Sequence, residues 1–282
     1  MDRASWTVAV AAALLVGTTG CGQQTAADTA GTPDTPAASP SPSASATEGA
    51  ARRGTVEVDG AELAYWCQGQ GAPVVLLEAG SDSAGTSEFS EMVPQIADVT
   101  TVCTYNRLGT GTGSDIAPKR ARTSTDLAET LDGVATALQL EPPYVVSGQS
   151  GGGNVVIAYA QAHPAKVAAL VPIEGYFDDP AEIAAWQADE GFTWEDNPEH
   201  VDVVAAAELQ AAYAMPFGDF PVLVISASSA DPGGPENQAH WLAISPRSSQ
   251  VVVDGPHDLP MSAPDELAAL IVGVVENVRA GE

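Results

Sequence analysis

Hydrophobic positions along this chain form short apolar runs separated by longer stretches in which apolar residues recur every three or four positions. The short runs predict β-strands at Thr55–Val58, Glu62–Cys67, Pro73–Leu77, Thr101–Tyr105, Tyr144–Val146, Val167–Ile173, Val222–Ser226 and Gln250–Val253. The helical spacing predicts α-helices at Ser87–Ile96, Thr123–Leu140, Asn154–His163 and Pro264–Val278. Because strands alternate with helices, the pattern favours a mostly parallel sheet covered on both faces.

The alternation breaks between Gly175 and Phe220, where two helix-like runs occur without an obvious strand. We interpret residues 176–219 as a small helical insertion. Its place after a strand indicates a cap over the C-terminal edge of the sheet. Trp and Phe side chains in this insertion suggest that it forms an apolar wall of a substrate pocket.

The N-terminal segment has the pattern of an export signal. Arg3 precedes an apolar run from Val8 to Val16, which is too short to span a bilayer comfortably. The sequence Thr18-Thr19-Gly20-Cys21 resembles a bacterial lipoprotein cleavage box, with Thr18 in place of the usual Leu. Residues 1–21 are therefore expected to comprise a signal peptide and a lipidated Cys21, and the competing interpretation is ordinary secretion with cleavage nearby.

Residues 22–54 consist mainly of Ala, Ser, Thr, Pro, Gly and Gln. Such a segment cannot bury enough apolar surface to offset the entropy lost on ordering. We expect a disordered tether there, and a folded domain over residues 55–282. The expected location is the extracellular face of the cell membrane, or the medium if the chain is secreted.

The charge balance restricts the choice of partner. The chain carries 37 acidic and 10 basic residues, which gives a formal net charge of −27. Nucleic acid and anionic membrane surfaces are poor partners for such a chain. We expect a monomer whose partner is a small molecule and which contacts the membrane only through its lipid anchor.

Cysteine usage fits an exported protein. With Cys21 lipidated, Cys67 and Cys103 remain as an even pair in a compartment where disulfides persist. A disulfide between them is expected, and two buried free thiols are the alternative. No histidine pair has the spacing of metal ligands, and the two cysteines lack partners for zinc, so neither a metal nor a cofactor is expected.

The most informative motif is Gly148-Gln149-Ser150-Gly151-Gly152. It lies between the apolar run Tyr144–Val146 and the helix-like stretch that begins at Asn154. A buried strand, a turn too tight for flanking side chains and then a helix are the context of a nucleophile elbow, which exposes the serine hydroxyl. The alternative is a glycine-rich turn in which the serine has no catalytic role.

With this motif, the order of elements resembles the α/β-hydrolase superfamily over nearly all of residues 55–282. The stretch Tyr105–Gly111 with Ser114 resembles the D-R-x-G-x-G-x-S loop of that family, with Asn106 in the position of the Asp. His257 follows a late strand and precedes a final helix, where the family places its catalytic histidine, although Pro256 replaces the usual Gly. The resemblance implies an α/β-hydrolase fold, in which the strands that carry the two cysteines are neighbours.

The resemblance also implies a catalytic triad in the chain order Ser, acid, His. Ser150 is the expected nucleophile and His257 the base that accepts its proton. Asp231 follows the strand Val222–Ser226 by a short loop, where the family usually keeps the acid. Glu174 is the alternative acid, because it ends the preceding strand and some members place the acid there.

An oxyanion formed during acyl transfer needs preorganised hydrogen-bond donors. The backbone N–H of Gly151 is the first expected donor. The second is expected from the loop that follows Pro73–Leu77, at Gly80 or at the neighbouring Ser81. Members of the family often have His-Gly in this loop, where this chain has Glu78-Ala79.

Three functions fit this set of residues. The leading one is a serine hydrolase that cleaves a carboxylic ester through an acyl-enzyme. An aminopeptidase or amidase of the same fold is the closest alternative. A tethered binding protein without catalysis is the third, since the sequence departs from the family at Glu78-Ala79, Asn106 and Pro256. Unusual reactivity of Ser150 would separate the enzymes from the binding protein.

Overall fold

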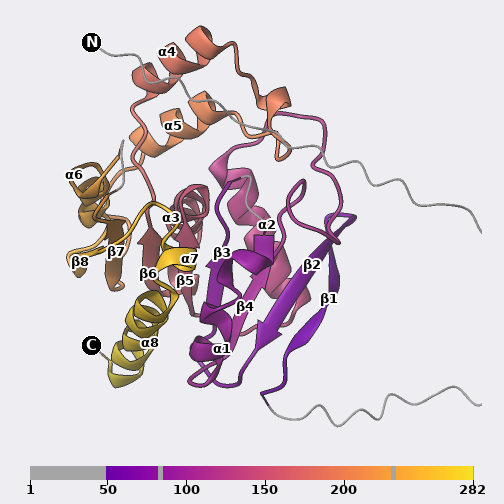
Figure 1. The fold of residues 1–282 in the computed structure, drawn as a ribbon, viewed down its shortest axis with the longest axis vertical. Coiled ribbons are helices and arrows are strands. Elements are labelled where there is room, and N and C mark those ends of the chain that lie inside the picture. The colour runs from indigo at the N-terminus through magenta and orange to yellow at the C-terminus, as the bar shows by residue number, and fades with distance from the viewer. Residues whose placement is uncertain (1–48, 82–84, 230–232, 282) are drawn as a thin grey trace, which may run out of the picture. The chain divides into compact units, whose positions relative to one another are not determined.

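An eight-stranded sheet organises the chain in the computed structural model, which describes residues 49–81, 85–229 and 233–281 (Figure 1). The strand order is β1-β2-β4-β3-β5-β6-β7-β8. The first three strands in this order pair antiparallel, and the remaining pairs are parallel. The strands span β1 Arg52–Val58, β2 Ala61–Gln68, β3 Val75–Glu78, β4 Val102–Tyr105, β5 Tyr144–Gln149, β6 Val167–Ile173, β7 Val222–Ala227 and β8 Ser248–Val253.

Helices cover both faces of the sheet and bury two separate apolar clusters. One cluster contains Leu127 and Leu131 of α2 and Val155 of α3, and the other contains Ile96 of α1 and Ile271 of α8. Side chains that alternate along the buried strand β5 contribute to both clusters, as expected of a strand covered on both sides. The helices span α1 Met92–Ala97, α2 Ser124–Ala137, α3 Gly151–Ala162, α4 Pro180–Glu190, α5 Val203–Ala211, α6 Pro235–Gln238, α7 Leu259–Ser262 and α8 Pro264–Ala280.

The predicted α/β-hydrolase architecture is confirmed. Several element boundaries differ from the prediction by two or three residues, and the predicted helix Ser87–Ile96 is a 3-10 turn, Gly85–Phe89, followed by the shorter α1. At the edge of the sheet, β1 begins at Arg52 and not at residue 55. Arg52, Arg53 and Gly54 pair in register with β2, and the Arg53 guanidinium lies 3.9 Å from the centre of the Trp66 ring. This cation–π contact and the ladder hydrogen bonds order three residues that composition alone places in the tether.

The segment between β6 and β7 contains α4 and α5 but no strand of the sheet, and lies at the top of Figure 1. Asp179 and Asp202 cap the two helices by accepting hydrogen bonds from backbone N–H groups of the first turn. The isolated parallel bridge between Arg122 and Val201 ties the stretch between α4 and α5 to the loop that precedes α2. The segment is thus held next to the start of α2.

Cys67 and Cys103 form a disulfide. The two residues are directly paired in the antiparallel ladder between β2 and β4. The register therefore decides which thiols meet, and the bridge fastens the antiparallel edge of the sheet to its parallel part.

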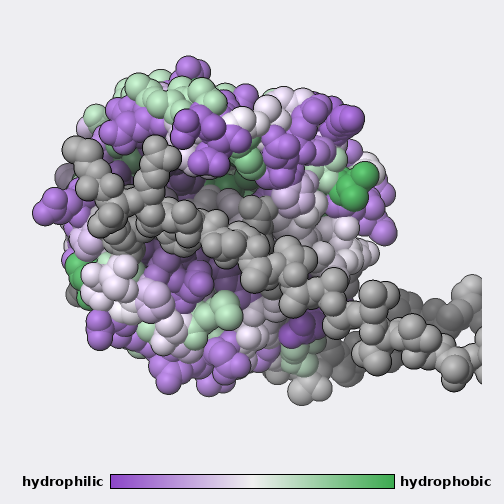
Figure 2. Space-filling model, turned by 45° about the horizontal axis from the view of Figure 1, so that its top comes forward, coloured by the Kyte–Doolittle hydropathy of each residue, from purple (hydrophilic) through white to green (hydrophobic). Residues whose placement is uncertain are grey.

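Several expectations fall outside the described residues. These are the signal peptide, lipidation at Cys21, most of the tether, and Asp231. Over the described ranges, no helix is long and apolar enough to span a membrane, and no cluster of His, Cys, Asp and Glu has the arrangement of a metal site. The face of the molecule seen in Figure 2 is mainly hydrophilic, with scattered hydrophobic residues.

Candidate active site

Ser150 lies at a strained turn between β5 and α3. Its φ angle is +53°, in a region that L-residues other than glycine rarely adopt. A Cβ on Gly148 would lie 2.3 Å from the Gly152 carbonyl oxygen, and a Cβ on Gly152 would lie 2.3 Å from the carbonyl oxygens of Glu78 and Ala79. Only glycine fits at either position. The motif thus forms the tight turn that the sequence predicts.

His257 follows β8 and is held by a buried carboxylate. Its Nδ1 lies 3.0 Å from Glu174 Oε2, and the Glu174 side chain is completely buried. The other carboxylate oxygen, Oε1, accepts hydrogen bonds from the Ala227 N–H at 2.5 Å and from Gln238 Nε2 at 2.7 Å. Glu174, directly after β6, also has a positive φ of +52°, a strained backbone conformation for a residue other than glycine. The carboxylate is therefore fixed in position before the imidazole meets it.

Tyr176 is a neighbour of His257 that the sequence patterns did not reveal. Its hydroxyl lies 2.6 Å from Nδ1, and the two rings stack with their centres 5.3 Å apart. Burial and the nearby Glu174 charge raise the pKa of Tyr176, so the phenol stays neutral at physiological pH. The only available signal was its place two residues after the candidate acid. Glu174 and Tyr176 together engage Nδ1 and leave Nε2 as the nitrogen for proton transfer.

The side chains of Ser150 and His257 line the same cleft. A hollow of about 360 Å³ is bounded by Ser150, His257, Gln149, Glu88 and Asp258, among others. Gln149 donates a hydrogen bond from Nε2 to the His257 carbonyl oxygen at 2.7 Å, which joins the elbow to the histidine loop. In the described part of the chain no hydrogen bond yet joins Ser150 Oγ to His257. Such contacts often tighten only when substrate binds.

The loop after β3 packs against the start of α3. A Cβ on Gly151 would lie 2.1 Å from Ser81 Oγ and 3.4 Å from the Ser81 backbone nitrogen. The Gly80 N–H already donates to Glu88 Oε2 at 2.9 Å. Of the two donors expected from this loop, the Gly80 N–H is thus engaged by a carboxylate, whereas the Ser81 nitrogen lies beside Gly151.

Glu78, which departs from the family pattern in this loop, belongs to a buried ionic network with Arg107 and Glu199. Arg107 is 2% exposed and donates to Glu78 Oε1 at 2.9 Å, to both carboxylate oxygens of Glu199, and to the Gly80 carbonyl oxygen at 2.8 Å. It also donates to the Ala79 carbonyl oxygen. Burial raises the pKa of Glu78 to about 7, against the lowering effect of Arg107. The network fastens the loop after β3 to Glu199.

Asn106, in the position of the family's Asp, hydrogen-bonds two backbone groups of the surrounding loops. Its Oδ1 accepts from the Thr86 N–H and its Nδ2 donates to the Thr112 carbonyl oxygen, both at 2.7 Å. An amide supplies both a donor and an acceptor, which an ionised carboxylate cannot do. The substitution therefore fits the local hydrogen bonds and removes no group from the cleft.

A second, smaller hollow of about 200 Å³ meets the cleft at Ser81 and Ser150 and extends toward α5. Asp178, which precedes α4, lines it. Burial raises the pKa of the Asp178 carboxyl to about 6. Its oxygens accept no hydrogen bond from any described residue, so nothing offsets the cost of burying this charge.

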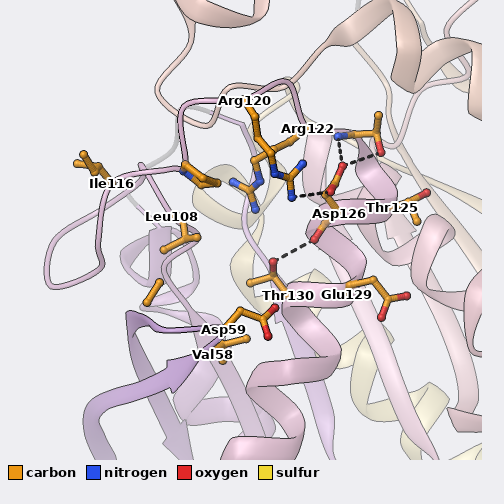
Figure 3. A pocket seen from close by; sticks show the side chains of 13 residues that line it. Val58, Asp59, Leu108, Ile116, Arg120, Arg122, Thr125, Asp126, Glu129 and Thr130 are labelled. Atoms are coloured by element: carbon orange, nitrogen blue, oxygen red, sulfur yellow. Dashed lines mark hydrogen bonds and ion pairs between the residues drawn. The ribbon is translucent and has the colours of Figure 1, made fainter.

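A more voluminous hollow, about 620 Å³, lies between the β1–β2 turn and the start of α2 (Figure 3). Arg120 forms an ion pair with Asp126 there at 2.9 Å, and Arg122 is directed toward the same side. None of its lining residues is a candidate for the triad or the oxyanion hole. We therefore place the candidate chemistry in the cleft at Ser150, despite its smaller volume.

Comparison with known proteins places this arrangement in a family. Residues 72–228, more than half of the chain, match the family model described as alpha/beta hydrolase fold. The chain belongs to the α/β-hydrolase family. The match includes the elbow and Glu174 and ends before β8 and His257.

Curated relatives match over part of their length. The chain is 34% identical over 109 residues to a putative carbamate hydrolase, RutD, from Caulobacter segnis, which is 38% of this chain and 39% of that protein. It is 29% identical over 124 residues to the uncharacterized hydrolase YraK of Bacillus subtilis, or 43% of this chain and 44% of the relative. The chain thus spans about two fifths of the length of these relatives.

Solved structures share the fold over a wider range. A thermophilic esterase from Thermogutta terrifontis superposes with a TM-score of 0.63 and 22% identity, covering 80% of this chain and 99% of the esterase. An enol-lactonase from Burkholderia xenovorans superposes with a TM-score of 0.63 and 18% identity, covering 79% and 100%. At these identities the likeness extends to the fold alone.

Proposed function

We propose that this α/β-hydrolase is a serine hydrolase that cleaves a carboxylic ester through an acyl-enzyme. Ser150 is the nucleophile, His257 the general base and then acid, and Glu174 the carboxylate that orients the imidazole. The observation that carries the proposal is the pairing of His257 Nδ1 with the buried Glu174 carboxylate in the cleft that Ser150 lines.

The reaction follows from this geometry. His257 Nε2 accepts the Ser150 hydroxyl proton while Oγ attacks the ester carbonyl carbon. The imidazolium that forms is stabilised by Glu174, and it then gives the proton to the leaving alcohol as the C–O bond breaks. Water then attacks the acyl carbonyl carbon while Nε2 takes its proton, and Nε2 gives that proton to Ser150 Oγ as the bond between Oγ and the acyl carbon breaks, which releases the carboxylic acid.

The tetrahedral oxyanion needs donors at the junction of the loop after β3 and α3. We assign them to the N–H groups of Gly151 and Ser81. Gly80 is the less favourable choice, because its N–H donates to Glu88. The N-terminus of α3 lies next to this position and favours negative charge there.

The choice of Glu174 over Asp231 rests on contacts. Glu174 meets Nδ1 directly and is held by two further hydrogen bonds. Asp231 stands in the loop after β7 where the family usually keeps the acid, and it stays the competing candidate. Separate amide variants distinguish the two.

Labelling with a fluorophosphonate probe tests the proposal. The full chain is labelled and the adduct is located by mass mapping, with Ser150→Ala and His257→Ala as variants. We expect an adduct on Ser150 in the wild type, and none in either variant. Ser147, a buried serine on β5, provides the matched control: Ser147→Ala leaves labelling intact. A folded wild-type protein that does not label would contradict a serine hydrolase and favour a binding protein.

A further inference from the structure

The charged side chains that line the cleft are mainly carboxylates. Two hollows meet at Ser81 and Ser150, and together they are lined by three carboxylates, Glu88, Asp258 and Asp178, with no Lys or Arg among the lining residues. A negative substrate would thus meet like charge on both sides of the nucleophile, whereas a cation would be attracted.

Asp178 is the carboxylate best placed to bind a substrate group. It lines the smaller hollow with Ser150, and its oxygens have no hydrogen-bond donor among the described residues. The backbone around it is clamped from two directions. Gln210 Oε1 accepts from the Asp178 N–H at 3.2 Å, and the Asn237 side chain bonds both the N–H and the carbonyl oxygen of Phe177.

Gln210 supplies a second, independent indication of a ligand. It is 2% exposed, yet it lines the same hollow, and its Nε2 has no acceptor among the described residues. A polar group that lines a hollow without a protein partner is available to a ligand. An acceptor and a donor with no described partner therefore line the hollow that Ser150 also lines, and a ligand ammonium group satisfies the acceptor.

The size of the hollow restricts the ligand further. Its volume of about 200 Å³ suits a short acyl chain. The wall also includes aliphatic side chains, Leu127, Val155, Val201, Val203 and Ala206, beside Ser124, Asn154 and Tyr176. A small amino-acid side chain fits this lining, while the ammonium faces Asp178.

We infer that the preferred acyl group is a short α-aminoacyl group, whose free ammonium pairs with Asp178 while its carbonyl carbon is presented to Ser150. This inference rests on the proposed function. The bond cleaved joins the amino-acid carbonyl to an alcohol or an amine, and Asp178 acts as a specificity residue that takes no part in proton transfer.

Two esters that differ only at one group measure how much the substrate ammonium contributes to kcat/KM. L-Alanine methyl ester and methyl isobutyrate have nearly the same shape, and differ by an ammonium in place of a methyl group. Acid release is followed in a pH-stat at pH 7, where Asp178 is mostly ionised. A charge-assisted hydrogen bond contributes enough to change kcat/KM by about 10- to 100-fold. We expect the wild type to prefer the alanine ester by that factor.

Two variants identify the residue responsible. Asp178→Asn keeps the shape and should remove most of the preference for L-alanine methyl ester over methyl isobutyrate. Asp189→Asn removes the same charge from an exposed position on α4 and should keep the preference. Where methyl esters turn over slowly, protection of Ser150 from the fluorophosphonate by L-alaninamide, compared with isobutyramide, gives the same comparison.

The outcomes distinguish failure of the inferred aminoacyl preference from failure of the proposed serine hydrolase function. Equal use of both esters by the wild type, or a preference that survives in Asp178→Asn, overturns the inference while leaving a serine hydrolase in place. Equal protection by the two amides overturns it in the same way. Absence of both ester turnover and Ser150 labelling overturns the proposed function, and the inference falls with it.

Discussion

Replacing Asp178 by Asn should stabilise the folded protein, and the gain should depend on pH. The Asp178 carboxyl is partly buried and has no charged or hydrogen-bonded partner among the described residues, and this burial raises its pKa from 3.8 to about 6. The folded chain therefore disfavours the ionised form. Asn has nearly the same shape and carries no charge, and it breaks no side-chain hydrogen bond of the folded protein.

The size of the effect follows from proton linkage. Each pKa unit corresponds to about 1.36 kcal/mol, so a rise of about 2 units costs the ionised form about 3 kcal/mol. Because the folded pKa lies above the unfolded one, the cost is absent below about pH 3.8, grows between pH 3.8 and 6, and is complete above pH 6. The expected gain from Asp178→Asn is about 3 kcal/mol at pH 7.5 and about 1 kcal/mol at pH 4.5. Tyr176, the other titratable group lining this hollow, has a raised pKa and stays neutral over this range.

Urea unfolding at pH 7.5 and pH 4.5 measures these differences. Asp189→Asn is the matched control, since it lowers the net negative charge equally from an exposed position on α4. A gain in Asp178→Asn no larger than the control at pH 7.5 would refute the reasoning, and so would a gain that stays constant with pH. A stabilising substitution that also abolishes the preference for the alanine ester would show that the charge is kept for binding and not for folding.

Two further predictions concern the triad acid and the disulfide. Glu174→Gln should lower kcat by about 10⁴-fold, because an amide facing Nδ1 favours the wrong imidazole tautomer of His257, whereas Asp231→Asn should lower it less than tenfold; steady-state ester kinetics decide, and the reverse order would make Asp231 the acid. Cys67→Ala combined with Cys103→Ala should lower the free energy of unfolding by about 4 kcal/mol, since the bridge closes a loop with a sequence separation of 36. Urea midpoints measured with and without reductant check this, and a wild type insensitive to reductant whose stability equals that of the double variant would contradict it.

The sequence by itself determined the order and type of most elements. Buried strands such as β5 read as continuous apolar runs, and α2 reads as leucines at helical spacing, because local periodicity records which face is buried. The elbow was equally local. Gly148 and Gly152 flank Ser150 within five residues, and the close approach of backbone atoms leaves room only for glycine. The periodicity and the approach of Gly148 to Gly152 depend on neighbours in the chain, which a sequence displays directly. The contact that requires glycine at position 152 is with Glu78 and Ala79, which only the fold brings there.

Tertiary structure decided the contacts between residues distant in sequence. Glu174 and Asp231 both follow a strand by a short distance, and only the fold shows that the Glu174 carboxylate meets His257, 83 positions further along the chain. The partial burial of Asp178 has no local signature either, although its neighbour Asp179 has the pattern of a helix cap. Desolvation and pairing arise from every element packed around a side chain, and no single stretch of sequence contains them.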